Sequence, residues 1–399
     1  MAKSKQQPRV RRPLSTRKLW LFRLLTLGIV FFCIEVFSYI GLRALEKKLS
    51  MDPMRHITPD KVESFLARRY DPDLGWGPTP DTVNSIGARS NHEYDDLERT
   101  VSVYGDSYAR GDGVSVEDSW AMQLEHRIDC GVLNFGVGGY GTDQAQMRME
   151  RKYPSARSST VLMCIQVENV MRNVNIYRGF FRPGFDPPKP RYIPKGDGLE
   201  VFNPFDSPEA VREILLEDPD RLIEYGKKYD ASCREMLVGG KPWRMHFPYT
   251  YQVGVRLPFI CRHVGYRVSK LGRHVHHFDE GSEGLDIMQR IILRFLDYAE
   301  QEGFQPAVVV FPTPRDVFRH VAYGDVPYEN LTKFLDQTNV PYYDLLEDLS
   351  QTGDPRDLMV NRAHHVNEKG SIIVAEKVAE FLRSADLIPS SPAASASNQ

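Results

Sequence analysis

The sequence predicts an α/β fold with a parallel sheet, carried behind one N-terminal membrane helix. Apolar strand-like runs alternate with helical patterns between residues 97 and 385, and strand, helix and strand in that order indicate parallel βαβ units. One run, 160–166, is apolar throughout, as in strands covered on both faces. The chain also begins with a basic segment followed by an apolar run that is long enough to cross a bilayer.

The apolar run at 19–42 contains 24 residues with two charges, Arg23 and Glu35, whereas about 20 apolar residues span the hydrocarbon. Eight Lys or Arg and no acid occupy residues 1–23, so we expect segment 1–18 in the cytoplasm and everything after 42 outside it. Because no small-residue cleavage site follows, an uncleaved anchor is expected. Glu35 is costly at depth, and we expect it near the interface, protonated, or paired with another span.

The chain has 399 residues, 41% of them hydrophobic, and a net charge of −2. This composition allows a large core and argues against nucleic acid as a partner. We predict a stalk and lead-in at 43–96, one catalytic domain at 97–385 with a Pro- and aromatic-rich insertion at 176–281, and a disordered tail at 386–399. Of the five cysteines, Cys33 lies in the span and the other four could form a disulfide outside the cytoplasm.

The elements of the domain follow from the period of their apolar residues. Strands are expected at 100–104, 132–135, 160–166, 307–311 and 340–343. Helices are expected at 120–127, 285–302, 328–337 and 368–383.

The first strand ends in Gly105-Asp106-Ser107. A serine there lies at the carboxyl edge of the sheet, where open α/β sheets hold their ligands. The following helix adds unpaired N–H groups and positive potential beside the hydroxyl. Serine attacks only if a base takes its proton, and by itself the motif also fits a structural glycine turn.

The order of three blocks resembles the SGNH/GDSL hydrolase family, in its membrane-anchored bacterial envelope type. Gly105-Asp106-Ser107 is similar to the first block, with Ser107 as nucleophile, and the run from Asn134 to Gly139 is similar to the second, Asn-x-Gly-x-x-Gly. His365, in His-x-Asn-x-x-Gly, resembles the family's general base, and its ordinary pKa near ~6.5 suits that role. The resemblance implies a three-layer, flavodoxin-like parallel sheet, an oxyanion-binding N–H at Gly139, and no cofactor or metal.

The third block departs from the family, which has Gly-x-Asn-Asp there. Here the strand ends Gln166-Val167-Glu168-Asn169, and a direct overlay puts Glu168, a carboxylate that would repel an oxyanion, at the Asn position. A shift by one residue makes Asn169 the donor. We therefore expect the N–H groups of Ser107 and Gly139 and the Asn169 amide to form the oxyanion hole. Arg172 and Asn173 are alternatives that would bind substrate instead.

The fifth block departs too, because Arg362 replaces the Asp that would orient His365. The imidazole tautomer would then be set by a backbone carbonyl, by Asn361, or by Asp354 or Asp357, and the site would work as a Ser-His dyad. If His364 were the base, Asn361 would take the place of the acid, but the downstream Asn and Gly would be out of register.

Other patterns are less specific. The run His274-Val275-His276-His277 lacks a recognised ligand spacing, so no metal is expected. Residues 256–273 fit a basic helix on a bilayer surface or an anionic polymer, or a solvated face. The aromatic residues of the insertion would either line a sugar-binding cleft or pack the lobe onto the sheet; they are Tyr177, Phe180, Phe181, Phe185, Tyr192, Trp243, Phe247 and Tyr249.

The sequence therefore predicts a membrane-anchored, extracytoplasmic serine esterase or O-acyltransferase that acts on an acylated, most simply acetylated, cell-surface glycan. A second hypothesis is a non-catalytic glycan-binding or assembly subunit that has kept the fold. Arg362 and Glu168 are the residues in its favour, because function depends on the site and not on the fold.

Overall fold

A computed structural model describes residues 15–49, 53–79, 82–90, 99–182, 184–237, 245–268, 272–351, 353–362 and 364–388. Five strands form the central sheet: β3 (Arg99–Tyr104), β4 (Gly131–Asn134), β5 (Thr160–Gln166), β8 (Gln305–Phe311) and β9 (Tyr342–Asp344). Their order is β4-β3-β5-β8-β9 and each neighbouring pair is parallel. Counted along the chain this is 2-1-3-4-5, the flavodoxin-like order, so the predicted fold class is confirmed.

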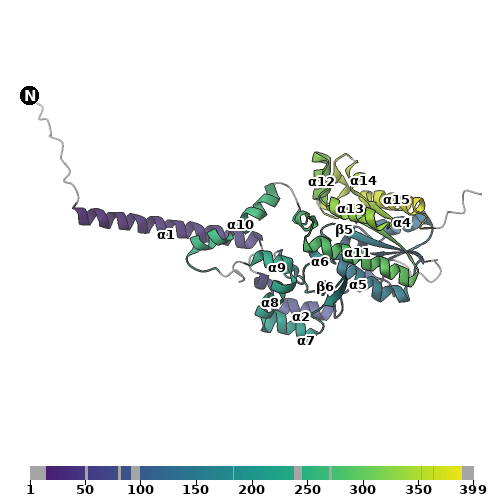
Figure 1. Cartoon of the computed structure of the whole chain (residues 1–399), viewed down its shortest axis with the longest axis horizontal. Helices are drawn as coiled ribbons and strands as arrows, with labels where there is room; N and C mark the ends of the chain where they lie inside the picture. Colours follow the sequence, from purple (N-terminus) through teal and green to yellow (C-terminus); the bar gives the residue numbers. More distant parts are fainter. Residues whose placement is uncertain are drawn as a thin grey trace, which may run out of the picture.

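Helices cover both faces of the sheet (Figure 1). On one face, α4 (Trp120–Ile128) packs against α15 (Glu368–Ser384), and on the other α5 (Thr142–Lys152) packs against α11 (Glu283–Glu302). The smaller helical elements of this domain are α3 (Ser107–Arg110), η3 (Tyr153–Ser155), α6 (Asn169–Asn173), α12 (Pro314–Tyr323), α13 (Glu329–Thr338), α14 (Leu346–Ser350), η7 (Pro355–Leu358) and η8 (Val360–Arg362).

The lead-in and the insertion share a second hydrophobic core. The lead-in contributes η1 (Pro53–His56), α2 (Pro59–Arg68) and the hairpin of β1 (Tyr70–Asp71) and β2 (Gly75–Trp76). The insertion contributes η4 (Arg178–Phe180), the hairpin of β6 (Arg191–Lys195) and β7 (Gly198–Phe202), α7 (Pro208–Arg212), η5 (Glu213–Glu217), α8 (Pro219–Tyr229), α9 (Ala231–Met236) and η6 (Val275–Phe278).

Most of the insertion's aromatic residues are used in packing. Tyr177 and Phe180 lie in this second core beside Trp76 of the lead-in, and Tyr192 is also fully buried. Phe181 instead lines the cavity described below, and Phe247 is 61% exposed. Trp243 lies outside the described residues.

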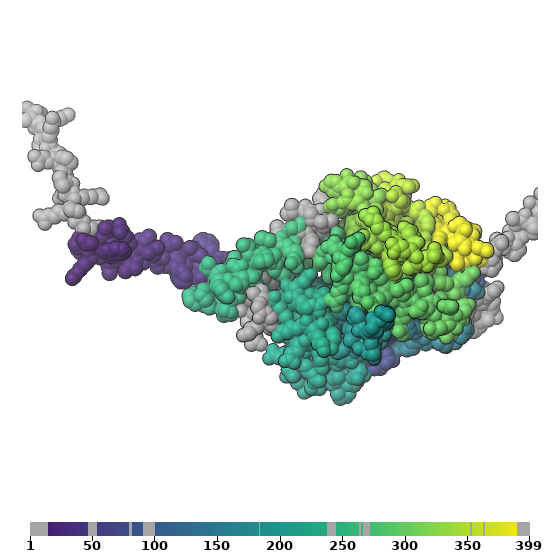
Figure 2. Space-filling model, in the orientation of Figure 1, coloured from purple at the N-terminus to yellow at the C-terminus, as the bar shows by residue number. Residues whose placement is uncertain are grey.

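A long helix, α1 (Thr16–Leu49), projects from the body of the molecule (Figures 1 and 2). Its 34 residues span about 51 Å at 1.5 Å per residue. Its most apolar stretch has a mean hydropathy of 2.1, and only 6% of it is buried. The helix is long and apolar enough to cross a membrane, as an anchor or a signal sequence does.

A second helix, α10 (Tyr249–Val268), packs along the C-terminal half of α1. Glu35 is buried at this contact, where its carboxylate accepts hydrogen bonds from the backbone N–H groups of Tyr249 (2.5 Å) and Thr250 (3.2 Å). Of the three expected environments of Glu35, the structure is closest to pairing with a second helix, through the N–H groups of its first turn.

The cysteines need one correction. All five lie within the described residues and all are free. No disulfide therefore joins Cys130, Cys164, Cys233 and Cys261, because the fold places Cys164 in the sheet and Cys233 in the second core.

Candidate active site

Ser107 is the first residue of α3, directly after β3. A side chain at Gly105 would place its Cβ 2.6 Å from the Cβ of Ala109 and 2.8 Å from the carbonyl oxygen of Cys164, so this turn requires glycine. Asp106 caps α3, since its carboxylate accepts a hydrogen bond from the N–H of Tyr108 at 2.8 Å. The sharp turn holds the Ser107 hydroxyl at the carboxyl edge of the sheet.

His365 comes from the loop before α15. Its Nε2 lies 2.8 Å from Oγ of Ser107, and its ring packs against that of Tyr108 with centroids 4.8 Å apart. Burial lowers the pKa of His365, although the charges of Asp106 and Asp112 partly oppose this shift. The imidazole is therefore neutral at neutral pH and can accept the serine proton.

No carboxylate orients His365 among the residues that the structure describes. Asp354 pairs with Arg356 at 2.6 Å, and neither it, Asp357 nor Asn361 hydrogen-bonds to the imidazole. The side chain of Arg362 lies outside the described residues. Of the two adjacent histidines, His365 contacts Ser107, whereas His364 is exposed at the cavity wall.

The backbone N–H groups of Ser107 and Gly139 make no hydrogen bond to any described residue. Both residues line the cavity. Gly139 has a φ of +89°, and a Cβ there would lie 2.9 Å from a guanidinium nitrogen of Arg178, so glycine is required. These two N–H groups are therefore free to donate hydrogen bonds to an oxyanion.

Asn169, the expected third oxyanion donor, does not lie at the cavity. It is fully buried at the start of α6 and is not among the residues that line the cavity, whereas Gln166 and Glu168 are. Neither its amide nitrogen nor its oxygen has a hydrogen-bond partner within the described part of the chain. The structure thus brings Ser107, Gly139 and His365 together and does not bring Asn169 to them.

A buried ion-pair network supports the Ser107 turn. Arg172 donates to Asp106 (2.9 Å), to the carbonyl oxygen of Tyr140 (2.9 Å) and to Glu168 (3.1 Å). Burial would raise the pKa of Glu168, but the charges of Arg172, His274 and Arg178 outweigh it and lower that pKa. The sequence suggests only substrate binding for Arg172, because its contact with Asp106 joins residues 66 positions apart and no local pattern indicates it.

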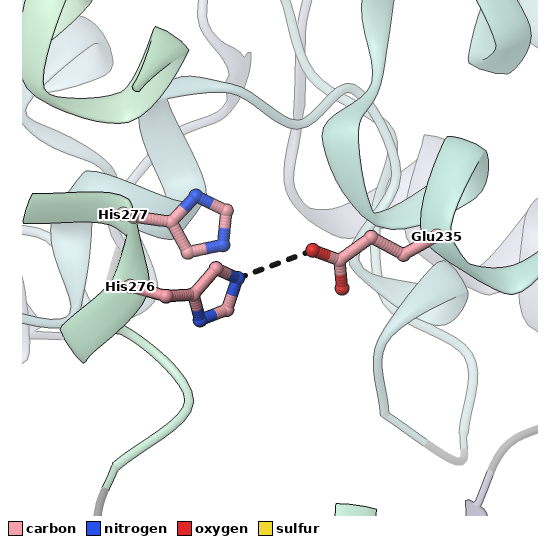
Figure 3. Close-up of side chains that lie close together, drawn as sticks. All are labelled: Glu235, His276 and His277. Carbon is pink, nitrogen blue, oxygen red and sulfur yellow. Dashed lines mark hydrogen bonds and ion pairs between the residues drawn. The ribbon is translucent and has the colours of Figure 1, made fainter. Parts of the chain in front are cut away.

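The run of histidines divides between two places. Nε2 of His274 lies 3.1 Å from Asp316, and both side chains are buried. His276 and His277 instead face Glu235 of α9 (Figure 3). One ring nitrogen of each histidine and one carboxylate oxygen of Glu235, the atoms that could bind a metal ion, lie within 4.8 Å of one another. Nε2 of His276 is 3.1 Å from the Glu235 carboxylate, and burial lowers the pKa of His277 to about 4.

The Ser107 hydroxyl and His365 open into a cavity of about 840 Å³. Its wall combines the sheet edge, the insertion and the lead-in, which contributes Arg69. The insertion contributes several arginines, among them Arg178 and Arg182, and α12 contributes Arg315. Sequence reasoning did not find these arginines, because they are scattered over nearly 250 positions of the chain and become one group only in the folded cavity.

Neither a family model nor a curated protein sequence matches the chain. Among solved structures, it is similar to a protein of the lipolytic G-D-S-L family from Desulfitobacterium hafniense DCB-2 (12% identity, 71% of this chain, 100% of that one, TM-score 0.35). It is also similar to the psychrotrophic esterase EstA from Pseudoalteromonas sp., with 10% identity, 72% of this chain and 98% of that one covered, and a TM-score of 0.35. The acetyl xylan esterase AlAXEase is similar with 13% identity, 72% of this chain and 98% of that one covered, and a TM-score of 0.35. At these low identities and TM-scores, the case for a function rests on the residues of the site.

Proposed function

We propose that this chain is a membrane-anchored serine esterase of SGNH/GDSL type, with Ser107 as nucleophile and His365 as general base. The observation that carries the proposal is the 2.8 Å contact between Ser107 Oγ and His365 Nε2. It joins residues 258 positions apart at the carboxyl edge of a parallel sheet, where such folds bind ligands.

The chemistry follows from this geometry. As Oγ of Ser107 attacks the ester carbonyl, Nε2 of His365 takes its proton, and the N–H groups of Ser107 and Gly139 stabilise the oxyanion. His365 then gives the proton to the leaving alcohol as the acyl-enzyme forms. In the second half, His365 takes a proton from water as the water oxygen attacks the acyl carbon, and it then gives that proton to Oγ of Ser107 as the acyl–Oγ bond breaks and the acid leaves. A sugar hydroxyl in place of water would make the same enzyme an O-acyltransferase.

The site works as a dyad in this proposal. The imidazole is oriented by packing against Tyr108 and by the short loop that precedes α15, where Asn367 accepts a hydrogen bond from the N–H of Gly370 at 3.1 Å. Without Asn169, the oxyanion would depend on two backbone donors. A missing third donor costs about 3–4 kcal/mol of transition-state stabilisation, so we expect a slow esterase.

The expected position of the catalytic domain outside the cytoplasm suggests its substrate. The basic segment before α1 favours a cytoplasmic N-terminus, which would put the domain outside the cytoplasm, facing surface glycans. We therefore propose an acetylated glycan as the ester.

The test uses the full-length protein in detergent with aryl acetates and longer acyl esters. Ser107→Ala and His365→Ala should each lower kcat/KM by about 100-fold or more, and a fluorophosphonate probe should label wild type but not Ser107→Ala. Matched controls are Ser384→Ala and His126→Ala, whose side chains are exposed and do not line the cavity. An inactive wild type that the probe does not label would favour the non-catalytic glycan-binding subunit.

Hydrolysis and transfer are separated by the fate of the acyl group. With a glycan acceptor added to an aryl acetate, an esterase releases acetate, whereas a transferase yields acetylated glycan. Mass spectrometry of the glycan distinguishes the two outcomes.

A further inference from the structure

The cavity at Ser107 is strongly positive. Among the described residues that line it, seven are arginines and two, Asp112 and Glu168, are acids. The chain as a whole has a net charge of −2. Positive charge is therefore concentrated at the site where the substrate enters, and clefts lined by one sign of charge attract ligands of the opposite sign.

Some of these arginines are already neutralised by acids of the protein. Arg110 pairs with Asp112. Arg172 pairs with Asp106 and Glu168. These pairs shape the wall and leave little charge to attract a ligand.

Arg178 has no acid at ion-pair distance among the described residues, and the charges of Asp186 and Glu168 act on it only at longer range. It is only 8% exposed, it lines the cavity, and it forms no ion pair with any carboxylate in the described part of the chain. Its Nη1 donates to the carbonyl oxygen of Gly139 at 3.3 Å, and its buried Nε has no hydrogen-bond partner among the described residues. Burial lowers the pKa of Arg178 to about 10, so the guanidinium is charged at neutral pH.

A buried, unpaired guanidinium is unfavourable unless an anion compensates it. The contact with Gly139 puts Arg178 beside one of the two oxyanion donors. Two further cationic groups line the same cavity: Arg69, whose buried Nε also has no partner among the described residues, and Arg315, which is exposed. A planar guanidinium fork matches a carboxylate, sulfate or phosphate.

We infer that the cavity contains an anion-binding subsite, centred on Arg178, for an acylated saccharide that bears a negative group close to its ester. The inference rests on the proposed esterase function and narrows it from glycans in general to acidic ones. Arg178 binds the anion beside the oxyanion hole, and Arg69 and Arg315 extend the positive surface along the saccharide. Such a subsite orients the ester carbonyl toward Ser107.

The experiment compares two matched substrates on the full-length protein in detergent: acetylated oligogalacturonate, and the same oligosaccharide after its carboxylates are reduced to neutral hydroxymethyl groups. Acetate release is measured. Wild type should favour the acidic form by about 10- to 100-fold in kcat/KM, the range of one or two charge-assisted hydrogen bonds. This preference should fall as salt is raised, because ions screen the exposed part of the positive surface.

Substitutions of single arginines test which of them produce the preference for the acidic substrate. Arg178→Gln should reduce the ratio of acidic to neutral kcat/KM by about 10-fold or more, whereas Arg178→Lys should retain part of it. Arg315→Gln, at an exposed position that does not threaten folding, should reduce the ratio less. The matched control is Arg221→Gln, a partly exposed arginine of α8 that lies outside the cavity.

Each outcome decides between the proposals. Equal kcat/KM for the two substrates, or an unchanged ratio in both Arg178→Gln and Arg315→Gln, would overturn the anion subsite while leaving the esterase intact. If wild type releases acetate from neither oligosaccharide nor from aryl acetates, the esterase itself is wrong. Sulfated or phosphorylated acetyl sugars, run in parallel, show which anion is preferred.

Discussion

At the scale of single residues, His365 sets the pH range of the proposed reaction. Only its neutral form accepts the serine proton, and burial lowers its pKa. Activity should therefore be full at neutral pH and fall on acidification with a midpoint below ~6.5, the value of an unperturbed histidine. The pH profile of kcat/KM on an aryl acetate measures this midpoint.

Asp112 gives this prediction a directional test. Its charge raises the pKa of His365, so Asp112→Asn should move the acid limb to still lower pH. Asp118→Asn, an exposed carboxylate in the loop before α4, serves as the control. A limb that moves to higher pH in Asp112→Asn would contradict the assignment of that limb to His365.

Arg172 is predicted to matter for stability. Arg172→Met would leave the fully buried carboxylate of Asp106 without its cation, which costs about 3–5 kcal/mol of unfolding free energy. Urea unfolding followed by tryptophan fluorescence measures this loss. Arg151→Met breaks a partly exposed pair with Asp71 and should cost less than about 1 kcal/mol. Equal losses in the two variants would mean that the Arg172 network does not hold the site.

At the scale of elements, the contact between α1 and α10 is the least expected feature. Glu35→Ala removes the acceptor of two N–H groups at the first turn of α10, a change comparable to the loss of an N-cap, about 0.5–2 kcal/mol. Hydrogen exchange at Tyr249 and Thr250 should become faster. Glu46→Ala, which removes a pair with Arg43 on α1 itself, should leave these amides unchanged.

Prediction of elements succeeded where the buried face is apolar. β5 runs from 160 to 166 as expected, and α15 begins at Glu368, where Asn367 caps it. α5 was missed because its buried face is largely polar: Asp143 pairs with Lys189 of the insertion at 2.5 Å, and both side chains are fully buried. The residues that make this face favourable are supplied by another part of the chain, so no helical pattern of apolar residues marks it.

At the scale of the whole molecule, α1 projects from the body of the protein and α10 packs against it (Figure 2). If the domain lies outside the cytoplasm, a membrane-impermeant maleimide should label exposed Cys261 of α10 in spheroplasts of an expressing host. Labelling should fall in Cys261→Ser and persist in Cys33→Ser, which removes the thiol in the predicted span. Labelling that requires permeabilised cells would place the domain in the cytoplasm.

The positions of the strands along the chain could be predicted from the sequence alone, and so could the pattern that points to Ser107, Gly139 and His365. These features depend on local signals, namely apolar periods, a glycine turn after a strand and a cap before a helix. Such signals involve residues that are close in the sequence, so they can be recognised without knowing any tertiary contact.

The packed fold was needed to show that Asn169 is buried away from the cavity and that Arg172 neutralises Asp106 and Glu168. It also gathered Arg178 and the other arginines around one cavity. The physical reason is that charge compensation, burial and hydrogen-bond distance arise between residues far apart in the chain, and those quantities exist only once the sheet, the insertion and the lead-in have packed together.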